Sequence, residues 1–163
     1  MSTIRLAIVT VSDGASRGER TDTSGAAIAA WAAERKHAVV AQVLLADDTV
    51  TIAGALARLA DVAEADVILT TGGTGLTARD VTPEATRSVL QREAPGIAEA
   101  IRAEGAPHTS YAWLSRGVAG TRGQTLIINL PGSESGVRDG LALLDRILVH
   151  AVQLMRGEDT SKH

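Results

Sequence analysis

Short apolar runs alternate along the chain with segments that have the apolar spacing of helices, and this alternation limits the fold more than any other feature. The runs cover residues 4–11, 38–45, 67–70 and 126–130. Such nearly continuous apolar runs are typical of strands covered on both faces of a parallel sheet. Because strands that alternate with helices are joined by right-handed crossovers, the sequence predicts an α/β fold. We expect a mostly parallel, doubly wound sheet with helices on both faces, in three layers.

Helix signals follow these runs. Asp48 or Thr49 caps a predicted helix over 49–63, because short polar side chains accept hydrogen bonds from the first free backbone N–H groups. Thr82 is predicted to cap another helix, with Pro83 in its first turn. We detect no repeat, low-complexity segment or linker, so we predict one domain over residues 1–163, with a frayed tail at 157–163.

Composition removes several classes of function. The chain has no cysteine, which excludes disulfides, thiolate metal sites and cysteine nucleophiles. With 16 Lys and Arg against 19 Asp and Glu, it lacks the basic footprint of a nucleic-acid-binding protein. No run of residues is long and apolar enough for a membrane span, and the first residues lack a secretory signal. We therefore expect a cytoplasmic protein that binds neither nucleic acid nor a membrane.

A glycine-rich segment follows the third apolar run and is the strongest local motif. In doubly wound sheets, ligands bind beyond the carboxyl ends of the strands, which selects the predicted loops at 12–22, 46–49, 71–82 and 131–135. The third loop opens with glycines that let backbone N–H groups approach a phosphate. A tight turn without a ligand is the alternative interpretation, and both remain open here. The motif consists of Thr71, Gly72, Gly73, Thr74 and Gly75.

Asp47 and Asp80 form the best pair of candidate carboxylates. Each follows a different predicted strand, so both are expected over the same edge of the sheet. Two carboxylates near a phosphate cradle suit Mg²⁺, which completes its octahedron with water and substrate phosphate. Helix capping is the competing role at this position, but Asp48 can cap and leave Asp47 free. No Ser-His-Asp or Lys-base arrangement can be placed, which favours a transfer reaction between two bound ligands.

Other polar residues near the predicted strand ends allow two interpretations each. The segment 131–133 begins the last helix and is either an anion site or an ordinary serine cap. Asn129 lies at a strand end and must find hydrogen-bond partners if it is buried. Several arginines in predicted loops either attract anionic ligands or are simply solvated. They are Arg17, Arg20, Arg79, Arg116 and Arg122.

Several motifs taken together resemble one known family. The glycine-rich segment at 71–75 is followed by Arg-Asp-Val-Thr-Pro-Glu at 79–84 and by Leu-Ile-Ile-Asn-Leu-Pro-Gly at 126–132. This order resembles the molybdopterin adenylyltransferase family of molybdenum-cofactor biosynthesis, whose fold also forms the G domain of gephyrin-type proteins. Matching motifs around Ser12-Asp13 and Leu114-Ser115-Arg116 extend the resemblance over residues 4 to 154.

The resemblance implies an activity and a set of site residues. AMP passes from ATP to the terminal phosphate of molybdopterin, pyrophosphate is released, and Mg²⁺ is required. Asp47 and Asp80 match the family's essential carboxylates, both catalytic and metal-binding. The loops expected to bind nucleotide and pterin contribute Ser12, Asp13, Thr71, Gly72, Gly73, Thr74, Gly75, Ser115, Arg116, Asn129, Pro131, Gly132 and Ser133. The resemblance also implies a homotrimer and a downstream molybdate-insertion protein as partner.

One departure and two alternatives accompany this assignment. After residues 131–133 the family usually places Pro and small residues, whereas this chain continues with Glu134, Ser135 and Gly136. A non-catalytic molybdopterin-binding or scaffold module of the same fold is the first alternative, and the presence of both Asp47 and Asp80 disfavours it. A pyridine-nucleotide hydrolase is the second, and it would need a water-activating base that the sequence does not offer.

Overall fold

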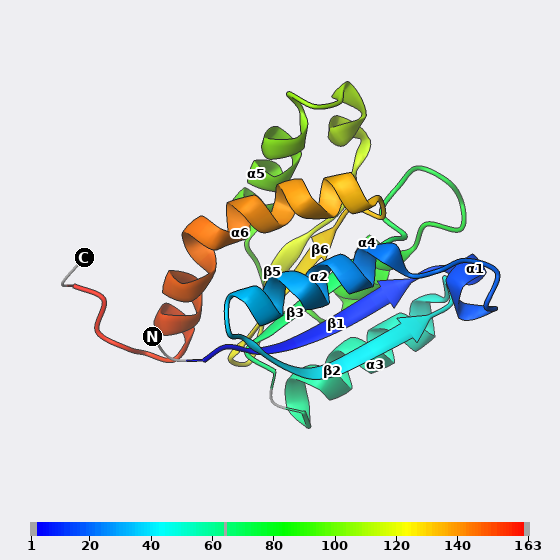
Figure 1. Ribbon diagram of the computed structural model, residues 1–163. Coiled ribbons are helices and arrows are strands. Elements are labelled where there is room, and N and C mark those ends of the chain that lie inside the picture. Colours follow the sequence, from blue (N-terminus) through cyan, green and yellow to red (C-terminus); the bar gives the residue numbers. More distant parts are fainter. Residues whose placement is uncertain (1–2, 64, 162–163) are drawn as a thin grey trace.

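The protein is built around one six-stranded sheet, seen in a computed structural model that describes residues 3–63 and 65–161 (Figure 1). The strand order is β2-β1-β3-β6-β5-β4. The first four strands in this order are parallel, and the last two are antiparallel to their neighbours. The strands are β1 (Arg5–Val11), β2 (Ala38–Leu45), β3 (Val67–Thr71), β4 (Arg92–Glu93), β5 (Ala119–Arg122) and β6 (Thr125–Leu130).

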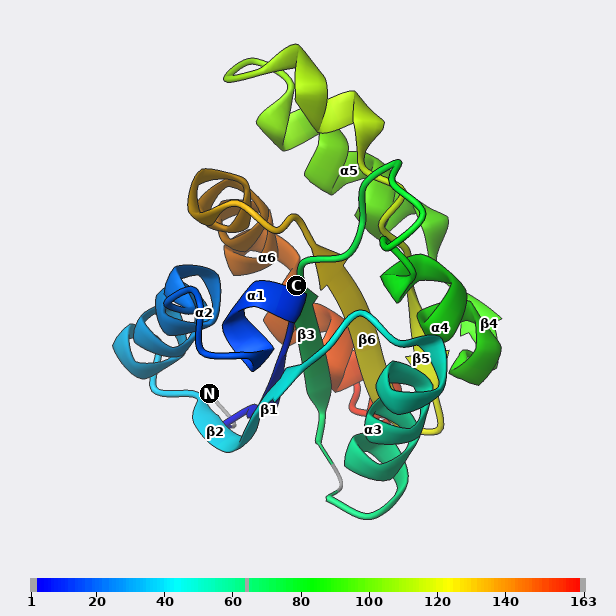
Figure 2. The ribbon, with the colours of Figure 1, turned by 90° about the vertical axis from the view of Figure 1, so that its right-hand side faces the viewer.

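Helices cover both faces of the sheet, which Figure 2 shows from its end. One face packs against α2 (Thr23–Glu34), α5 (Pro95–Gly105) and α6 (Glu134–Met155), and the other against α3 (Thr49–Asp61) and α4 (Thr82–Val89). Neighbouring residues of a strand point to opposite faces of the sheet. Ile8 therefore packs in the apolar cluster under α2, α5 and α6, and Val9 packs in the cluster under α3 and α4. The predicted α/β fold with a mostly parallel, doubly covered sheet is confirmed.

The prediction that residues 38–45 form a buried strand is wrong. The segment is a strand, β2, but it lies at the edge of the sheet and bonds only to β1. Its side chains Val39, Val40 and Leu44 are about 40% exposed, at 40%, 42% and 41%. Composition cannot separate edge strands from central ones, because an apolar run reports strand propensity and not the number of neighbours.

Several short elements were not predicted. Strands β4 and β5 are too short and polar to form an apolar run, and they exist because β5 pairs with β6 and β4 pairs with β5. Gly120 allows this pairing, since a Cβ there would lie 2.3 Å from the carbonyl oxygen of Arg92. Helix α1 (Asp13–Ser16) lies inside a segment predicted as loop, and the 3-10 helix η1 (Ser110–Leu114) follows α5.

The helix caps agree with the prediction at one position and differ at another. Asp48 caps α3, since its Oδ2 accepts a hydrogen bond of 2.8 Å from the backbone N–H of Thr51. The prediction that Thr82 caps α4 is wrong, because Val81 takes the cap position and makes no side-chain hydrogen bond there. Thr82 is instead the first residue of the helix, and its side chain is buried.

The last helix ends at Met155, and residues 157–161 continue outside any helix or strand. Residues 162–163 of the predicted frayed tail lie outside the described residues. Among the helices of the described chain, none combines the length and the apolar character that crossing a membrane requires.

Candidate active site

A cavity of about 440 Å³ opens beyond the carboxyl ends of the parallel strands. Each of the four predicted loops contributes to its lining, with Ser12 from the first, Asp47 from the second, Gly73 from the third and Gly132 from the fourth. Parallel strands end at a common edge, so loops that are distant in sequence meet there. This cavity is the candidate active site.

The glycine-rich segment forms one wall of this cavity, and two of its glycines cannot be replaced without strain. Gly72 and Gly73 have φ values of 93° and 66°, in the left-handed region that favours glycine. A Cβ on Gly72 would lie 2.1 Å from the carbonyl oxygen of Val11, and one on Gly73 would lie 2.3 Å from Oγ1 of Thr82. The segment is therefore a tight turn and a cavity wall at once.

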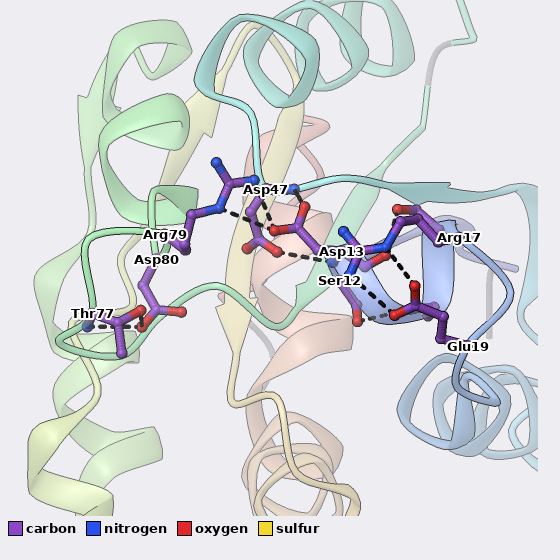
Figure 3. A network of polar contacts seen from close by, with 10 residues as sticks. Ser12, Asp13, Arg17, Glu19, Asp47, Thr77, Arg79 and Asp80 are labelled. Carbon is purple, nitrogen blue, oxygen red and sulfur yellow. Dashed lines mark hydrogen bonds and ion pairs between the residues drawn. The ribbon is translucent and has the colours of Figure 1, made fainter.

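Asp47 is held by a reciprocal pair of hydrogen bonds with Asp13 (Figure 3). The backbone N–H of Asp13 donates to Oδ2 of Asp47 at 3.0 Å, and the backbone N–H of Asp47 donates to Oδ1 of Asp13 at 2.9 Å. Burial raises the pKa of the Asp47 carboxyl, and the charges of Asp13 and Asp80 add to this rise. The other oxygen, Oδ1, lies against Gly73, where a Cβ would approach it to 3.1 Å.

Asp13 also connects Asp47 to the loop after the glycine-rich segment, through an ion pair with Arg79. Its Oδ2 accepts two hydrogen bonds from the guanidinium of Arg79, at 2.7 and 3.0 Å. The Asp47 N–H, and next the Arg79 guanidinium, hold the pKa of the Asp13 carboxyl below its usual value. Asp13 is therefore a negative charge that orients Asp47 and engages Arg79.

Asp80 lines the same cavity as Asp47 but is held by its own loop. Its Oδ2 accepts hydrogen bonds from the backbone N–H and the hydroxyl of Thr77, at 3.0 and 2.7 Å. This carboxylate lies so close to Gly75 that a Cβ there would be 2.8 Å from Oδ2. The structure thus brings the two predicted carboxylates to one cavity, while their catalytic and metal-binding roles remain predictions.

Arg116 forms hydrogen bonds with the backbone of the loop that contains Asp80. Its Nε donates to the carbonyl oxygen of Gly75 and its Nη2 to the carbonyl oxygen of Asp80, both at 2.7 Å. Its Nη1 forms an ion pair with Glu84, and its backbone N–H donates to the carbonyl oxygen of Thr74 at 2.8 Å. The guanidinium is therefore engaged by the protein itself, although the resemblance places Arg116 on the substrate side.

Two further predicted site residues have structural partners. Asn129 is buried, accepts a hydrogen bond from the N–H of Val118, and donates to the hydroxyls of Thr70 and Thr86. Its amide thus joins β6 to its neighbours in the core and lies outside the lining of the cavity. Ser133 caps α6 by accepting a hydrogen bond of 3.1 Å from the N–H of Gly136.

A second hollow of about 420 Å³ adjoins the cavity and shares Gly73, Asp80 and Gly132 with it. Its lining contains four more residues of the predicted set and adds three apolar side chains. The predicted residues in its lining are Thr74, Gly75, Ser115 and Pro131, and the added ones are Leu76, Tyr111 and Leu114. Two adjoining hollows that meet at Asp80 offer room for two ligands.

Sequence reasoning missed one feature of this region and left a second one open. The hydroxyl of Thr82 is buried beside Gly73 and has no hydrogen-bond partner among the described residues, and a Thr-Pro pair carries no signal of this beyond a cap. Arg20, which the sequence left as either an anion-attracting or a solvated arginine, lines the cavity together with Asp22. Asp22 caps α2 and also accepts a hydrogen bond of 2.7 Å from the hydroxyl of Thr10.

Comparison with known proteins gives consistent matches. The model of the probable molybdopterin binding domain family matches residues 7–150. A Drosophila melanogaster protein named molybdenum cofactor synthesis protein cinnamon is 41% identical over 162 residues, which are 99% of this chain but 27% of the fly protein. The Helicobacter pylori protein named molybdopterin adenylyltransferase is 36% identical over 167 residues, covering 96% of this chain and 90% of its own.

Solved structures agree with the sequence matches. The crystal structure of MoaB from Thermus thermophilus, described as a molybdopterin biosynthesis enzyme, has a TM-score of 0.90 and 49% sequence identity, and the match covers 96% of this chain and 98% of MoaB. The family resemblance inferred from the motifs is therefore confirmed. The chain belongs to the probable molybdopterin binding domain family.

Proposed function

We propose that the protein is a molybdopterin adenylyltransferase, which transfers AMP from ATP to the terminal phosphate of molybdopterin and releases pyrophosphate. The observation that carries this proposal is the placement of Asp47 and Asp80, which come from different strand ends and line one cavity beside the glycine-rich loop. The names of relatives that match nearly the whole chain, such as the Helicobacter pylori adenylyltransferase, support it.

The chemistry suits a cavity whose lining contains no His, Cys or Lys among the described residues. A phosphate oxygen of molybdopterin, already ionised at neutral pH, attacks the α-phosphorus of ATP. A new P–O bond forms, the bond between the α-phosphorus and the oxygen bridging to the β-phosphorus breaks, and pyrophosphate leaves with the electron pair. No proton has to move, so the reaction needs no general base from the protein. Positioning and charge neutralisation supply the catalysis.

The residues of the cavity provide this positioning. Gly72 and Gly73 line the cavity with backbone atoms alone, so phosphate oxygens can approach these atoms directly. The reciprocal bonds with Asp13 fix one oxygen of Asp47 and leave Oδ1 toward the glycine wall. Thr77 fixes Asp80 in the same way. Two carboxylates are thus oriented before any ligand binds, which lowers the cost of ordering them in the reaction.

The donor set also suits Mg²⁺, and we propose Asp47 and Asp80 as the residues that hold it. Among the described residues no cluster of three or more metal-ligating side chains occurs, which fits an ion that prefers one or two carboxylates together with water and phosphate oxygens. Gly73 and Gly75 allow these carboxylates to lie close to the backbone of the loop, because a Cβ on either glycine would press on one of them. When bound, Mg²⁺ supplies neutralisation of the negative charge on the polyphosphate.

The proposal is tested by incubating the protein with ATP, Mg²⁺ and molybdopterin and by measuring adenylyl-molybdopterin and pyrophosphate. We expect the two products in equal amounts, and a loss of turnover of about 100-fold or more in Asp80→Asn. Asp61→Asn is the matched control, because Asp61 is exposed and pairs with Arg122 outside the cavity lining. Molybdopterin that is bound but unmodified would instead identify a scaffold module.

Four further properties belong to the same proposal. We propose that residues 1–163 form a single domain, that the protein works in the cytoplasm, that it assembles as a homotrimer, and that a downstream molybdate-insertion protein is its partner. The homotrimer follows from the resemblance to the molybdopterin adenylyltransferase family. Sedimentation analysis of the purified protein tests the trimer, and a pull-down with the molybdate-insertion protein tests the downstream partner.

A further inference from the structure

We infer that Arg20 binds a phosphate group of one of the anionic substrates, and so contributes a ligand contact that neither the glycine-rich loop nor the paired carboxylates provide. The inference rests on the proposed function. It depends on where the guanidinium lies, on what the other arginines near the cavity do, and on the balance of charge in the lining.

The fold directs Arg20 toward the cavity. Arg20 follows α1 in the first loop and is part of the cavity lining. Its aliphatic stem lies over Gly14, where a Cβ would be 3.2 Å from Cδ and 3.4 Å from Cγ of the arginine. Because Gly14 has no side chain, the stem of Arg20 can lie against α1 while the residue lines the cavity.

The other arginines around the site are already engaged. Arg79 pairs with Asp13 at 2.7 Å, Arg17 pairs with Glu19 at 2.8 Å, and Arg116 is bound to two carbonyl oxygens and to Glu84. Within residues 3–63 and 65–161, the guanidinium of Arg20 makes no hydrogen bond and no ion pair within 4 Å. Its charge is felt by Glu19 only at longer range. Arg20 is therefore available to a ligand.

The lining of the cavity has more acidic than basic side chains, so an anionic ligand needs a cation there. Asp22, Asp47 and Asp80 contribute carboxylates to the cavity, and Arg20 is the only Lys or Arg in its lining among the described residues. Asp22 accepts hydrogen bonds from Thr10 and Gly25 at its two oxygens and forms no ion pair with Arg20 among the described residues. The proposed reaction brings two anions together here. A guanidinium can bind a phosphate with two parallel hydrogen bonds and reduce this repulsion.

Binding measurements on the full chain test the inference. Titration calorimetry measures the dissociation constants of inorganic pyrophosphate and of Mg-ATP, and steady-state assays give the KM of molybdopterin. The variants are Arg20→Gln, Arg20→Lys and the matched control Arg17→Gln, which changes a neighbouring exposed arginine that pairs with Glu19 and does not line the cavity. We expect Arg20→Gln to weaken binding of a phosphate ligand about tenfold, Arg20→Lys less, and Arg17→Gln not at all.

The outcomes separate this inference from the proposed function. Weaker Mg-ATP binding in Arg20→Gln assigns the contact to the nucleotide, whereas a higher KM for molybdopterin alone assigns it to the pterin phosphate. Unchanged constants in Arg20→Gln, an equal loss in Arg17→Gln, or a wild type that binds no phosphate ligand overturn the inference. A wild type that binds pyrophosphate through Arg20 but forms no adenylyl-molybdopterin overturns the proposed function instead.

Discussion

Asp47 and Asp80 line the same cavity, but the protein holds them by different means. Asp47 follows the edge strand β2 and is fixed by its neighbour across the loop, through reciprocal bonds with Asp13. Asp80 belongs to the loop after the central strand β3, which depends on Thr77 and on the distant Arg116. Asp47 therefore depends on hydrogen bonds between two loops at adjacent strand ends. Asp80 depends on the Arg116 clamp, which is the set of hydrogen bonds from the Arg116 guanidinium to the carbonyl oxygens of Gly75 and Asp80.

The largest expected effect comes from a glycine on the Asp47 side. Gly73→Ala places a methyl group 2.3 Å from Oγ1 of Thr82, at a positive φ. We expect activity to fall more than about 100-fold and the free energy of unfolding to fall by about 1–3 kcal/mol, as measured by steady-state assay and urea denaturation.

Gly75→Ala is the matching change on the Asp80 side. There the methyl group meets only the end of the Asp80 side chain, at 2.8 Å, and that end can move. Activity should fall while stability stays within about 0.5 kcal/mol of wild type. Gly54→Ala, in a helix with open space around it, is the control and should be neutral or slightly stabilising. Equal stability losses at positions 73 and 75 would contradict the difference between the two sides.

The clamp on Asp80 is expected to have a smaller effect. Arg116→Gln removes the bonds to the carbonyl oxygens of Gly75 and Asp80, so we expect kcat to fall about tenfold with little change in KM. Glu84→Gln weakens the same clamp from its other side and should share the defect. The double variant should be no worse than the worse single one, because both act on one unit.

Two readouts decide whether Arg116 acts on the loop or on a ligand. Hydrogen exchange of residues 75–81 should become faster in both clamp variants and stay unchanged in Arg146→Gln, a control arginine that pairs with Glu104 on the surface. A higher KM and a steeper salt dependence in Arg116→Gln, without the exchange effect, would place the guanidinium on a substrate instead.

The pH dependence concerns Asp47. Burial raises the pKa of this carboxyl, and the charge of Asp13 adds to the rise, so activity that needs the carboxylate should be lost on the acid side at a higher pH than an ordinary aspartate gives. Asp13→Asn removes the charge of the Asp13 side chain but keeps the Asp13 backbone N–H, which donates a hydrogen bond to the Asp47 carboxylate. We therefore expect the acid limb of the pH profile of kcat/KM to move to lower pH.

The sign for stability is opposite to that for activity. A carboxyl with a raised pKa favours the folded state while it is protonated, and this contribution is lost as the pH rises through the folded-state pKa. Asp47→Asn, which remains neutral, should therefore be more stable than wild type at neutral pH, and the difference should fade in acid. A difference that grows in acid would contradict the raised pKa.

The sequence predicted those parts of the fold and site that depend on local patterns. Strands β1, β3 and β6 have nearly continuous apolar runs, and the cap at Asp48 depends on residues close in sequence. The four loops were found because parallel strands end at one edge. Two other features depend on tertiary contacts, which no local sequence pattern records. They are the buried hydroxyl of Thr82 and the hydrogen bonds of Arg116 to residues about 40 positions away in the sequence.

The edge position of β2 allows the last and smallest prediction. Val40→Thr changes an exposed side chain, so the free energy of unfolding should stay within about 0.5 kcal/mol of wild type, with activity unchanged because the Asp13 and Asp47 bonds lie beyond the strand. Val9→Thr puts the same hydroxyl into the buried centre of β1 and should cost about 1–3 kcal/mol. An equal loss in the free energy of unfolding at both positions would mean that another chain covers β2 in solution. The loop that carries Asp47, directly after β2, would then also lie near that second chain.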